Sequence, residues 1–120
     1  MKPKESEKTL EARLVREIEA RGGMALKYTS QFHRGIPDRI ILLPFGMIGF
    51  VELKSTGKTP TKLQAHAMLK LHKLGFDTFV IDCTEKLEDF LKIVDESRQQ
   101  AIRDFINRAV LTGSFDKLPQ

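Results

Sequence analysis

Hydrophobic residues near the N-terminus recur at the three- and four-residue spacing of an amphipathic helix. They are Leu10, Leu14, Val15 and Ile18. Ser6 stands where an N-cap would accept from the first turn, and the pair Gly22-Gly23 supplies a stop signal. The pattern therefore predicts a first helix from Ser6 to about Arg21.

Four later segments are rich in β-branched, aromatic and other apolar residues, and glycine, proline or polar residues bound them. They are Met24–Tyr28, Asp38–Leu43, Ile48–Lys54 and Phe76–Asp82. Such segments are typical of strands. Only Pro44-Phe45-Gly46 turns the chain between the second and the third, so these two are predicted to pair as an antiparallel hairpin. Residues 29–37 are mostly polar and are predicted to form a loop.

Helical spacing returns after the third strand. Thr59-Pro60 is predicted to be the N-cap and first-turn pair of a second helix, which runs to Leu74 and ends at Gly75. The apolar positions of this helix are Leu63, Ala67, Leu71 and Leu74.

A third helix is predicted to begin at Thr84, and helical spacing continues over Ser97–Leu111, as one helix or as two. The apolar positions are first Leu87, Leu91 and Val94, then Ile102, Phe105, Ile106 and Val110. The element order α-β-β-β-α-β-α predicts an α/β fold with a mixed sheet flanked by helices. We expect a domain over residues 1–96 and a C-terminal helical extension over 97–120, packed on that domain or at a dimer interface.

Composition sets limits on this picture. The chain has 120 residues, of which 41% are hydrophobic, which fits one domain with a modest core. A charged N-terminus and the lack of a long apolar run predict an intracellular, cytoplasmic protein without a membrane span. The single cysteine, Cys83, excludes an internal disulfide framework and is expected to be buried beside a strand end.

Charge is distributed unevenly along the sequence. Between Ala20 and Phe76 there are nine Lys or Arg residues, but only two of the 16 acidic residues, Asp38 and Glu52. A central segment so poor in carboxylates is typical of a surface that faces a polyanion. The two exceptions lie in predicted strands, where an unpaired charge is costly.

Strand alternation places Glu52 and Lys54 on one face of the third strand. Pairing within the hairpin brings Asp38 beside them, because the start of one strand lies next to the end of the other. Two adjacent carboxylates repel unless a cation lies between them, and hard oxygen ligands suit Mg²⁺ or Mn²⁺. The alternative interpretation is structural, with Asp38 capping the loop and Glu52 forming a solvated pair with Lys54.

These residues resemble the VRR-NUC domain of the PD-(D/E)XK nuclease superfamily. The resemblance covers roughly Glu7 to Asp82. Its motifs are Gly35-Ile36-Pro37-Asp38-Arg39 and Phe50-Val51-Glu52-Leu53-Lys54, with Leu26-Lys27-Tyr28-Thr29-Ser30 before them and Leu63-Gln64 after them. It implies a restriction-endonuclease-like αβββαβ core and a nuclease that uses Mg²⁺ or Mn²⁺. The loop sequence differs from the usual sequence of the family at Gln31-Phe32-His33.

The resemblance also implies roles for single residues. Asp38 and Glu52 would be metal ligands, and Lys54 would place the water or the scissile phosphate. The family has a further glutamate on the first helix, and Glu11 is the better candidate because it falls within the apolar stripe. Glu7 also falls there, but in the first turn, where the helix dipole explains an acid. Gln64 matches the glutamine of the family's active site, although such a residue can simply border a core.

Two functions remain open from the sequence. The first is a metal-dependent DNA endonuclease, selective for branched DNA such as a Holliday junction and acting as a homodimer. The second is a noncatalytic module that kept the fold to bind DNA or a protein. The candidate DNA contacts are Lys27, Ser30, Arg34, Lys58 and Lys62. The full set of acids with Lys54 favours the enzyme, because a binding module gains nothing from carboxylates facing phosphates.

Overall fold

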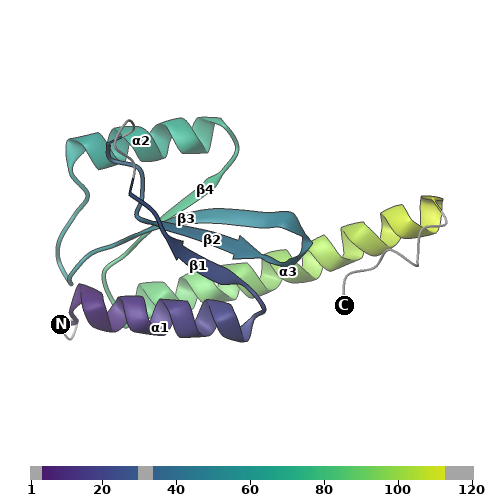
Figure 1. The fold of residues 1–120 in the computed structure, drawn as a ribbon, viewed down its shortest axis with the longest axis horizontal. Coiled ribbons are helices and arrows are strands. Elements are labelled where there is room, and N and C mark those ends of the chain that lie inside the picture. The colour runs from purple at the N-terminus through teal and green to yellow at the C-terminus, as the bar shows by residue number, and fades with distance from the viewer. Residues whose placement is uncertain (1–3, 30–33, 113–120) are drawn as a thin grey trace.

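The computed structural model describes residues 4–29 and 34–112, which form a four-stranded sheet between helices (Figure 1). The elements in chain order are α1 (Glu7–Ala20), β1 (Met24–Lys27), β2 (Arg39–Leu43), the short 3₁₀ turn η1 (Pro44–Gly46), β3 (Met47–Leu53), α2 (Lys62–Lys73), β4 (Asp77–Ile81) and α3 (Thr84–Thr112). This order confirms the predicted mixed α/β fold. None of the helices in the described ranges is long and apolar enough to cross a membrane.

The strands lie side by side in the order β1-β2-β3-β4. The first two pairings are antiparallel and the pairing of β3 with β4 is parallel. Within the predicted hairpin, Leu43 faces Met47 at the turn and Arg39 faces Val51 at the open end. The beginning of β2 therefore lies beside the end of β3.

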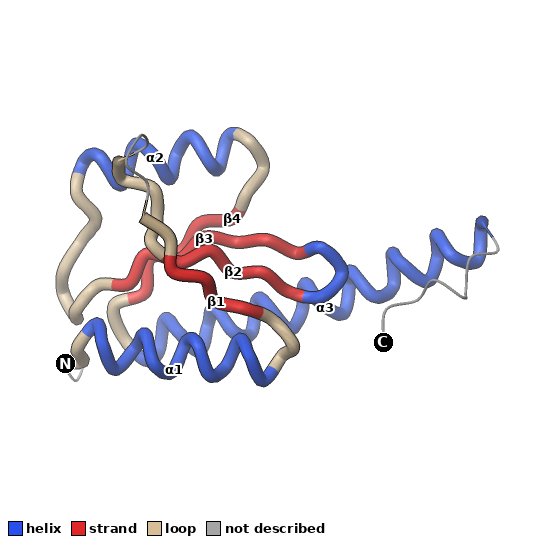
Figure 2. The backbone as a smooth tube through the Cα atoms, viewed as in Figure 1, coloured by secondary structure: helices blue, strands red, loops and turns tan. Residues whose placement is uncertain are grey.

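Helices α1 and α3 cover one side of the sheet and α2 lies over the other (Figures 1 and 2). The core lies on the α1 and α3 side, and its members are Leu10, Leu14, Ile18, Ile41, Val51, Leu53, Ile81, Leu87, Phe90, Leu91 and Val94. Strand alternation explains why Val51 and Leu53 are buried there. Glu52, between them, points to the α2 side.

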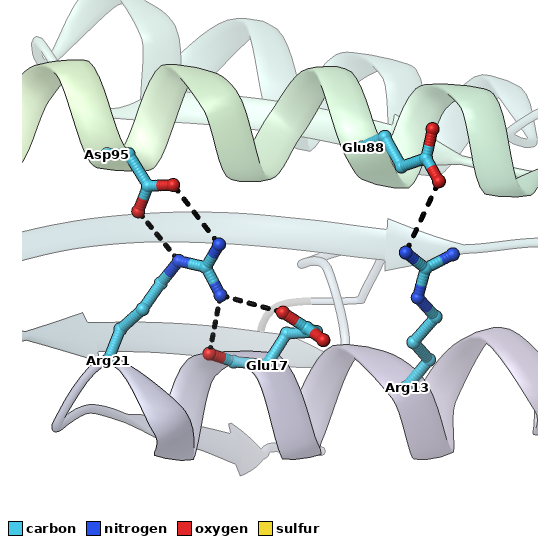
Figure 3. A network of polar contacts seen from close by, with 5 residues as sticks. All are labelled: Arg13, Glu17, Arg21, Glu88 and Asp95. Atoms are coloured by element: carbon cyan, nitrogen blue, oxygen red, sulfur yellow. Dashed lines mark hydrogen bonds and ion pairs between the residues drawn. The ribbon is translucent and has the colours of Figure 1, made fainter.

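Ion pairs join α1 to α3 at the surface of this layer (Figure 3). Arg21 donates to Asp95 Oδ1 from Nε at 2.7 Å and to Glu17 Oε2 from Nη1 at 2.9 Å. Arg13 reaches Glu88 at 3.3 Å. The hydrogen bond from Arg21 lowers the pKa of Asp95, which favours the ionised carboxylate in this contact between the two helices.

A single helix, α3, crosses the expected boundary between residues 96 and 97 without a break. Its C-terminal half projects past the hairpin end of the sheet (Figures 1 and 2). There Phe105 packs edge to face on Phe45 with the ring centres 5.9 Å apart. Farther along, Ile106 and Val110 are 41% and 57% exposed. The extension therefore packs partly on its own domain and leaves an apolar surface uncovered.

The prediction for α2 was wrong in two details. The helix begins at Lys62 with Thr61 as N-cap, two residues after the expected cap, because Thr61 and Gln64 form a reciprocal capping box. Leu63 and Leu74, expected on the apolar stripe, are 51% and 72% exposed. Leu74 follows the last full turn, and the half-buried face of the helix is instead formed by Gln64, Ala67, Met68 and Leu71.

Candidate active site

Asp38 and Glu52 lie together at the open end of the β2–β3 hairpin. Asp38 directly precedes β2, and Glu52 is the second-last residue of β3. The backbone N–H of Asp38 donates to Glu52 Oε2 at 3.3 Å. The antiparallel register alone produces this approach, since it places the start of one strand against the end of the other.

Lys54 lies beside the same carboxylate. Its Nζ is 3.5 Å from Glu52 Oε1. Residues two apart on an extended chain share a face, and the backbone N–H of Lys54 continues the ladder by donating to Ile81 O at 3.0 Å. The ammonium is therefore held at the carboxylate pair by a backbone that is itself fixed.

Gln64 connects the first turn of α2 to the pair. Its Nε2 donates to Glu52 Oε1 at 2.7 Å, while its Oε1 accepts from the backbone of Thr61 at 2.9 Å. Both ends of the amide are thereby used, which fixes its orientation. Gln64 both caps α2 and holds the Glu52 carboxylate in place.

Gly35 lets the loop before Asp38 approach α2 closely. Its φ of +86° is rarely adopted by residues with a side chain, and an added Cβ would lie only 2.5 Å from the carbonyl oxygen of Leu63. The loop backbone therefore rests on the first turn of α2. This contact brings Asp38, Glu52 and Gln64 into one site from three separate segments.

The electrostatics of the pair indicate a place for a cation. Burial raises the pKa of Asp38 and of Glu52, and the charge of Asp38 raises that of Glu52 further, while Lys54 opposes the effect. Asp38 Oδ1 is buried and has no hydrogen-bond partner within the described ranges. A free carboxylate oxygen beside a second buried carboxylate fits a hard divalent ion. Within residues 4–29 and 34–112, no group of three or more His, Cys, Asp or Glu side chains could hold a metal ion.

Glu11, on α1, contacts Arg39 and not the carboxylate pair. It accepts a hydrogen bond from the guanidinium of Arg39, which also donates to Ala25 O at 2.9 Å. The charge of Glu11 still contributes to raising the pKa of Asp38, after burial. Glu7, the other candidate on α1, is exposed in the first turn of the helix.

Sequence reasoning missed Arg39, although a signal was present. By strand alternation Arg39 shares the inward face of β2 with Ile41, where a charge calls for a partner. It is only 7% exposed. An arginine at a core position next to the candidate ligand Asp38 was the clue to a second polar contact behind the carboxylate pair.

The candidate DNA contacts that the structure describes are all exposed, and they lie on different elements. Lys27 is exposed at the end of β1, and its charge lowers the pKa of Asp38, although burial dominates and raises it. Arg34, Lys58 and Lys62 are exposed on the loops next to α2 and at its start. Ser30 lies outside the described residues.

An apolar pocket of about 170 Å³ opens elsewhere, between the hairpin end of the sheet and α3. Its walls include Ile41, Met47, Phe79, Phe90 and Ile93, and neither Asp38 nor Glu52 lines it. The carboxylate pair thus lies apart from this hollow.

Comparisons with known proteins bear on the fold and the family of the chain. No protein-family model matches the chain. The protein named "Putative nuclease p44" from Acyrthosiphon pisum secondary endosymbiont phage 1 is 39% identical over 89 residues, which cover 74% of this chain and 95% of that protein. A solved structure described as a VRR_NUC domain has the same fold, with a TM-score of 0.69 at 24% identity, over 73% of this chain and 97% of its own. The chain therefore belongs to the nuclease family of that phage protein and has the fold of a VRR_NUC domain.

Proposed function

We propose that this protein is a DNA endonuclease that depends on Mg²⁺ or Mn²⁺. The observation that carries the proposal is the pair Asp38 and Glu52, which are half-buried and buried, adjacent, and short of one partner at Asp38 Oδ1. Two carboxylates in this state are costly without a cation. In a family of nucleases, the function that offsets this cost is metal-assisted hydrolysis of a phosphodiester.

The residues of the candidate site would have different roles in this reaction. Asp38 and Glu52 would hold the ion, and Gln64 fixes the orientation of Glu52 through its 2.7 Å hydrogen bond. A bound divalent ion would polarise a phosphate and lower the pKa of water. Lys54, whose Nζ is 3.5 Å from Glu52 Oε1, would orient the attacking water or balance charge on the scissile phosphate.

DNA would cross the exposed basic residues next to this site. Four exposed basic residues could contact its phosphates: Lys27, Arg34, Lys58 and Lys62. The segment between Ala20 and Phe76, to which they belong, contains only two acidic residues, Asp38 and Glu52. We keep Ser30 as a further candidate contact. Each phosphate that is neutralised releases counterions, so binding should weaken steeply with salt.

We further propose selectivity for branched DNA and action as a homodimer. The catalytic core is small, and a twofold pair would present two sites to a symmetric branched substrate without additional sequence. The apolar surface left uncovered on the projecting half of α3, with Ile106 and Val110 exposed, supports the pairing.

A cleavage assay tests the nuclease. Linear duplex, flap and four-way junction DNA are incubated with Mg²⁺, Mn²⁺, Ca²⁺ or excess chelator. We expect incision only with Mg²⁺ or Mn²⁺, preferentially of the branched substrates, and none by Asp38→Asn or Glu52→Gln. Lys54→Ala should lower turnover by about 10² or more while DNA affinity in Ca²⁺ changes little.

Two exposed residues of α3 provide matched controls. Asp89→Asn and Lys92→Ala make the same chemical changes away from the carboxylate pair, and both should cut like the unaltered protein. Cleavage by Asp38→Asn in excess chelator at the normal rate would disprove metal-dependent hydrolysis at this site. Normal affinity and folding without any cleavage would instead favour the binding module.

A further inference from the structure

Arg39 is a buried cation that joins three elements. Its side chain is 8% exposed, and its two terminal nitrogens contact different partners, Ala25 O on β1 and the carboxylate of Glu11 on α1. The planar guanidinium suits such a fork because its donors point in fixed, divergent directions. The Nε of Arg39 is buried with no partner in the described part of the chain.

A gain in folding stability is a weak explanation for the buried ion pair between Arg39 and Glu11. A buried ion pair loses about as much by desolvation as it gains by attraction, and well-packed apolar residues often replace such a pair without loss. The inward face of β2 is otherwise apolar, with Ile41 1% exposed. A position that could hold one more isoleucine holds an arginine whose backbone neighbour is Asp38.

The location of the ion pair gives a stronger reason. Glu11 lies close enough to Asp38 for their charges to interact, yet its carboxylate is bound to Arg39, and the described residues contain no three-carboxylate group. A charge-assisted hydrogen bond fixes the direction in which a carboxylate points and offsets its negative charge, so a carboxylate bound in this way is attracted less to a second cation. Arg39 and a divalent ion at Asp38 therefore compete for the same side chain.

We infer that Arg39 is a positioning residue that holds Glu11 away from the metal site, so that Asp38 and Glu52 alone bind the ion in the DNA-free protein. This inference rests on the proposed function. Glu11 becomes a ligand only when its bond to Arg39 opens, and the strength of that bond sets how weakly the free protein binds its metal.

A double-mutant cycle on Mn²⁺ binding tests the inference without any cleavage step. The dissociation constant is measured in the absence of DNA, from the electron paramagnetic resonance signal of free Mn²⁺, for the unaltered protein, Arg39→Gln, Glu11→Gln and the double variant. Arg39→Gln should tighten binding in both backgrounds, because it removes a cation next to Asp38. In the background that keeps Glu11, Arg39→Gln should lower the Mn²⁺ dissociation constant by about ten times more than in the Glu11→Gln background, because only there is a carboxylate freed from Arg39.

Two other results would overturn the inference. Equal tightening in both backgrounds would mean that Arg39 acts only through its charge. Weaker binding by folded Arg39→Gln would mean that Arg39 presents Glu11 to the ion. Arg39→Lys covers the case in which Arg39→Gln does not fold: it keeps the charge but loses the fork, so any tightening must come from Glu11 and vanish in the Glu11→Gln background.

Arg21→Gln is the matched control, since Arg21 also pairs with acids on a helix but lies in the α1–α3 layer. It should leave the Mn²⁺ dissociation constant unchanged. Failure of the proposed function would look different from failure of this inference. In that case the unaltered protein would not bind Mn²⁺, or Asp38→Asn would bind it equally well.

Discussion

At the scale of single residues, the carboxylate pair lowers the stability of the fold. A buried oxygen without a partner, as at Asp38 Oδ1, costs about 1–3 kcal/mol of folding free energy. Burial raises the pKa of Asp38, and proximity to Asp38 adds to the rise for Glu52, so the ionised pair strains the metal-free fold. Functional sites commonly carry such costs.

Removal of one charge should therefore stabilise the protein while removing its function. We expect Asp38→Asn to raise the thermal midpoint of the chelator-treated protein at pH 7 by a few degrees, which corresponds to about 1 kcal/mol. Added Mn²⁺ should stabilise the unaltered protein and leave the variant unchanged. The exposed Asp89→Asn is the control for loss of charge. A lower midpoint for Asp38→Asn would show that the carboxylate supports the fold.

At the scale of elements, the site depends on how the loop of residues 34–37 meets the start of α2. Gly35 and Gly57 have nearly equal φ values of +86° and +87°. Only Gly35 is crowded, because an added Cβ would meet the backbone of Leu63 and Gln64, while nothing lies within 4 Å at Gly57. These two glycines separate the cost of backbone strain from the cost of a steric clash.

Alanine substitutions at Gly35 and Gly57 should differ in their effects on stability and on activity. Gly57→Ala should cost about 1–2 kcal/mol for the left-handed backbone and keep its activity. Gly35→Ala should cost more than that and lose most of its activity, because the loop must move off α2 and separate Gln64 from Glu52. Urea unfolding and the cleavage assay measure both effects. Equal losses at the two positions would mean that contact with α2 does not build the site.

At the scale of the whole molecule, the two halves of helix α3 lie in different surroundings. The first half of α3 buries Leu87, Phe90, Leu91 and Val94 in the core. The second half projects beyond the sheet (Figure 1). There Phe105 packs on Phe45, while Ile106 and Val110 are exposed. A helix of 29 residues with one apolar face covered over only part of its length is suited to contact a second copy.

Charge placed on this surface should prevent pairing. We expect light scattering to give twice the 13.7 kDa chain mass for the unaltered protein, and one chain mass for Ile106→Glu with Val110→Glu. Leu111→Glu is the control, because Leu111 is 85% exposed but lies roughly 140° from Ile106 around the helix. A monomer that still cuts both strands of a junction would contradict the role proposed for the dimer.

Much of the architecture and half of the site follow from local sequence. Strand alternation and the Pro44–Gly46 turn already place Asp38, Glu52 and Lys54 together, because a hairpin is a local structure with a short loop. The same reasoning predicted a buried Cys83 at a strand end, and it is 4% exposed after β4. The start of α2 was misplaced because Thr59 and Thr61 each offered a cap, and two of its predicted apolar-stripe positions, Leu63 and Leu74, are exposed.

The tertiary structure alone decided the contacts between segments distant in the chain. Gln64 reaches Glu52 from another element, Gly35 touches α2 through the backbone, and Glu11 meets Arg39 across 28 positions. A pattern of residue types records which face of an element is apolar, but not how two elements are oriented against each other. For Glu11 this difference mattered most, because its position on the helix fits both a metal ligand and the partner of a buried arginine, and only the packing of α1 on β2 supplies the arginine.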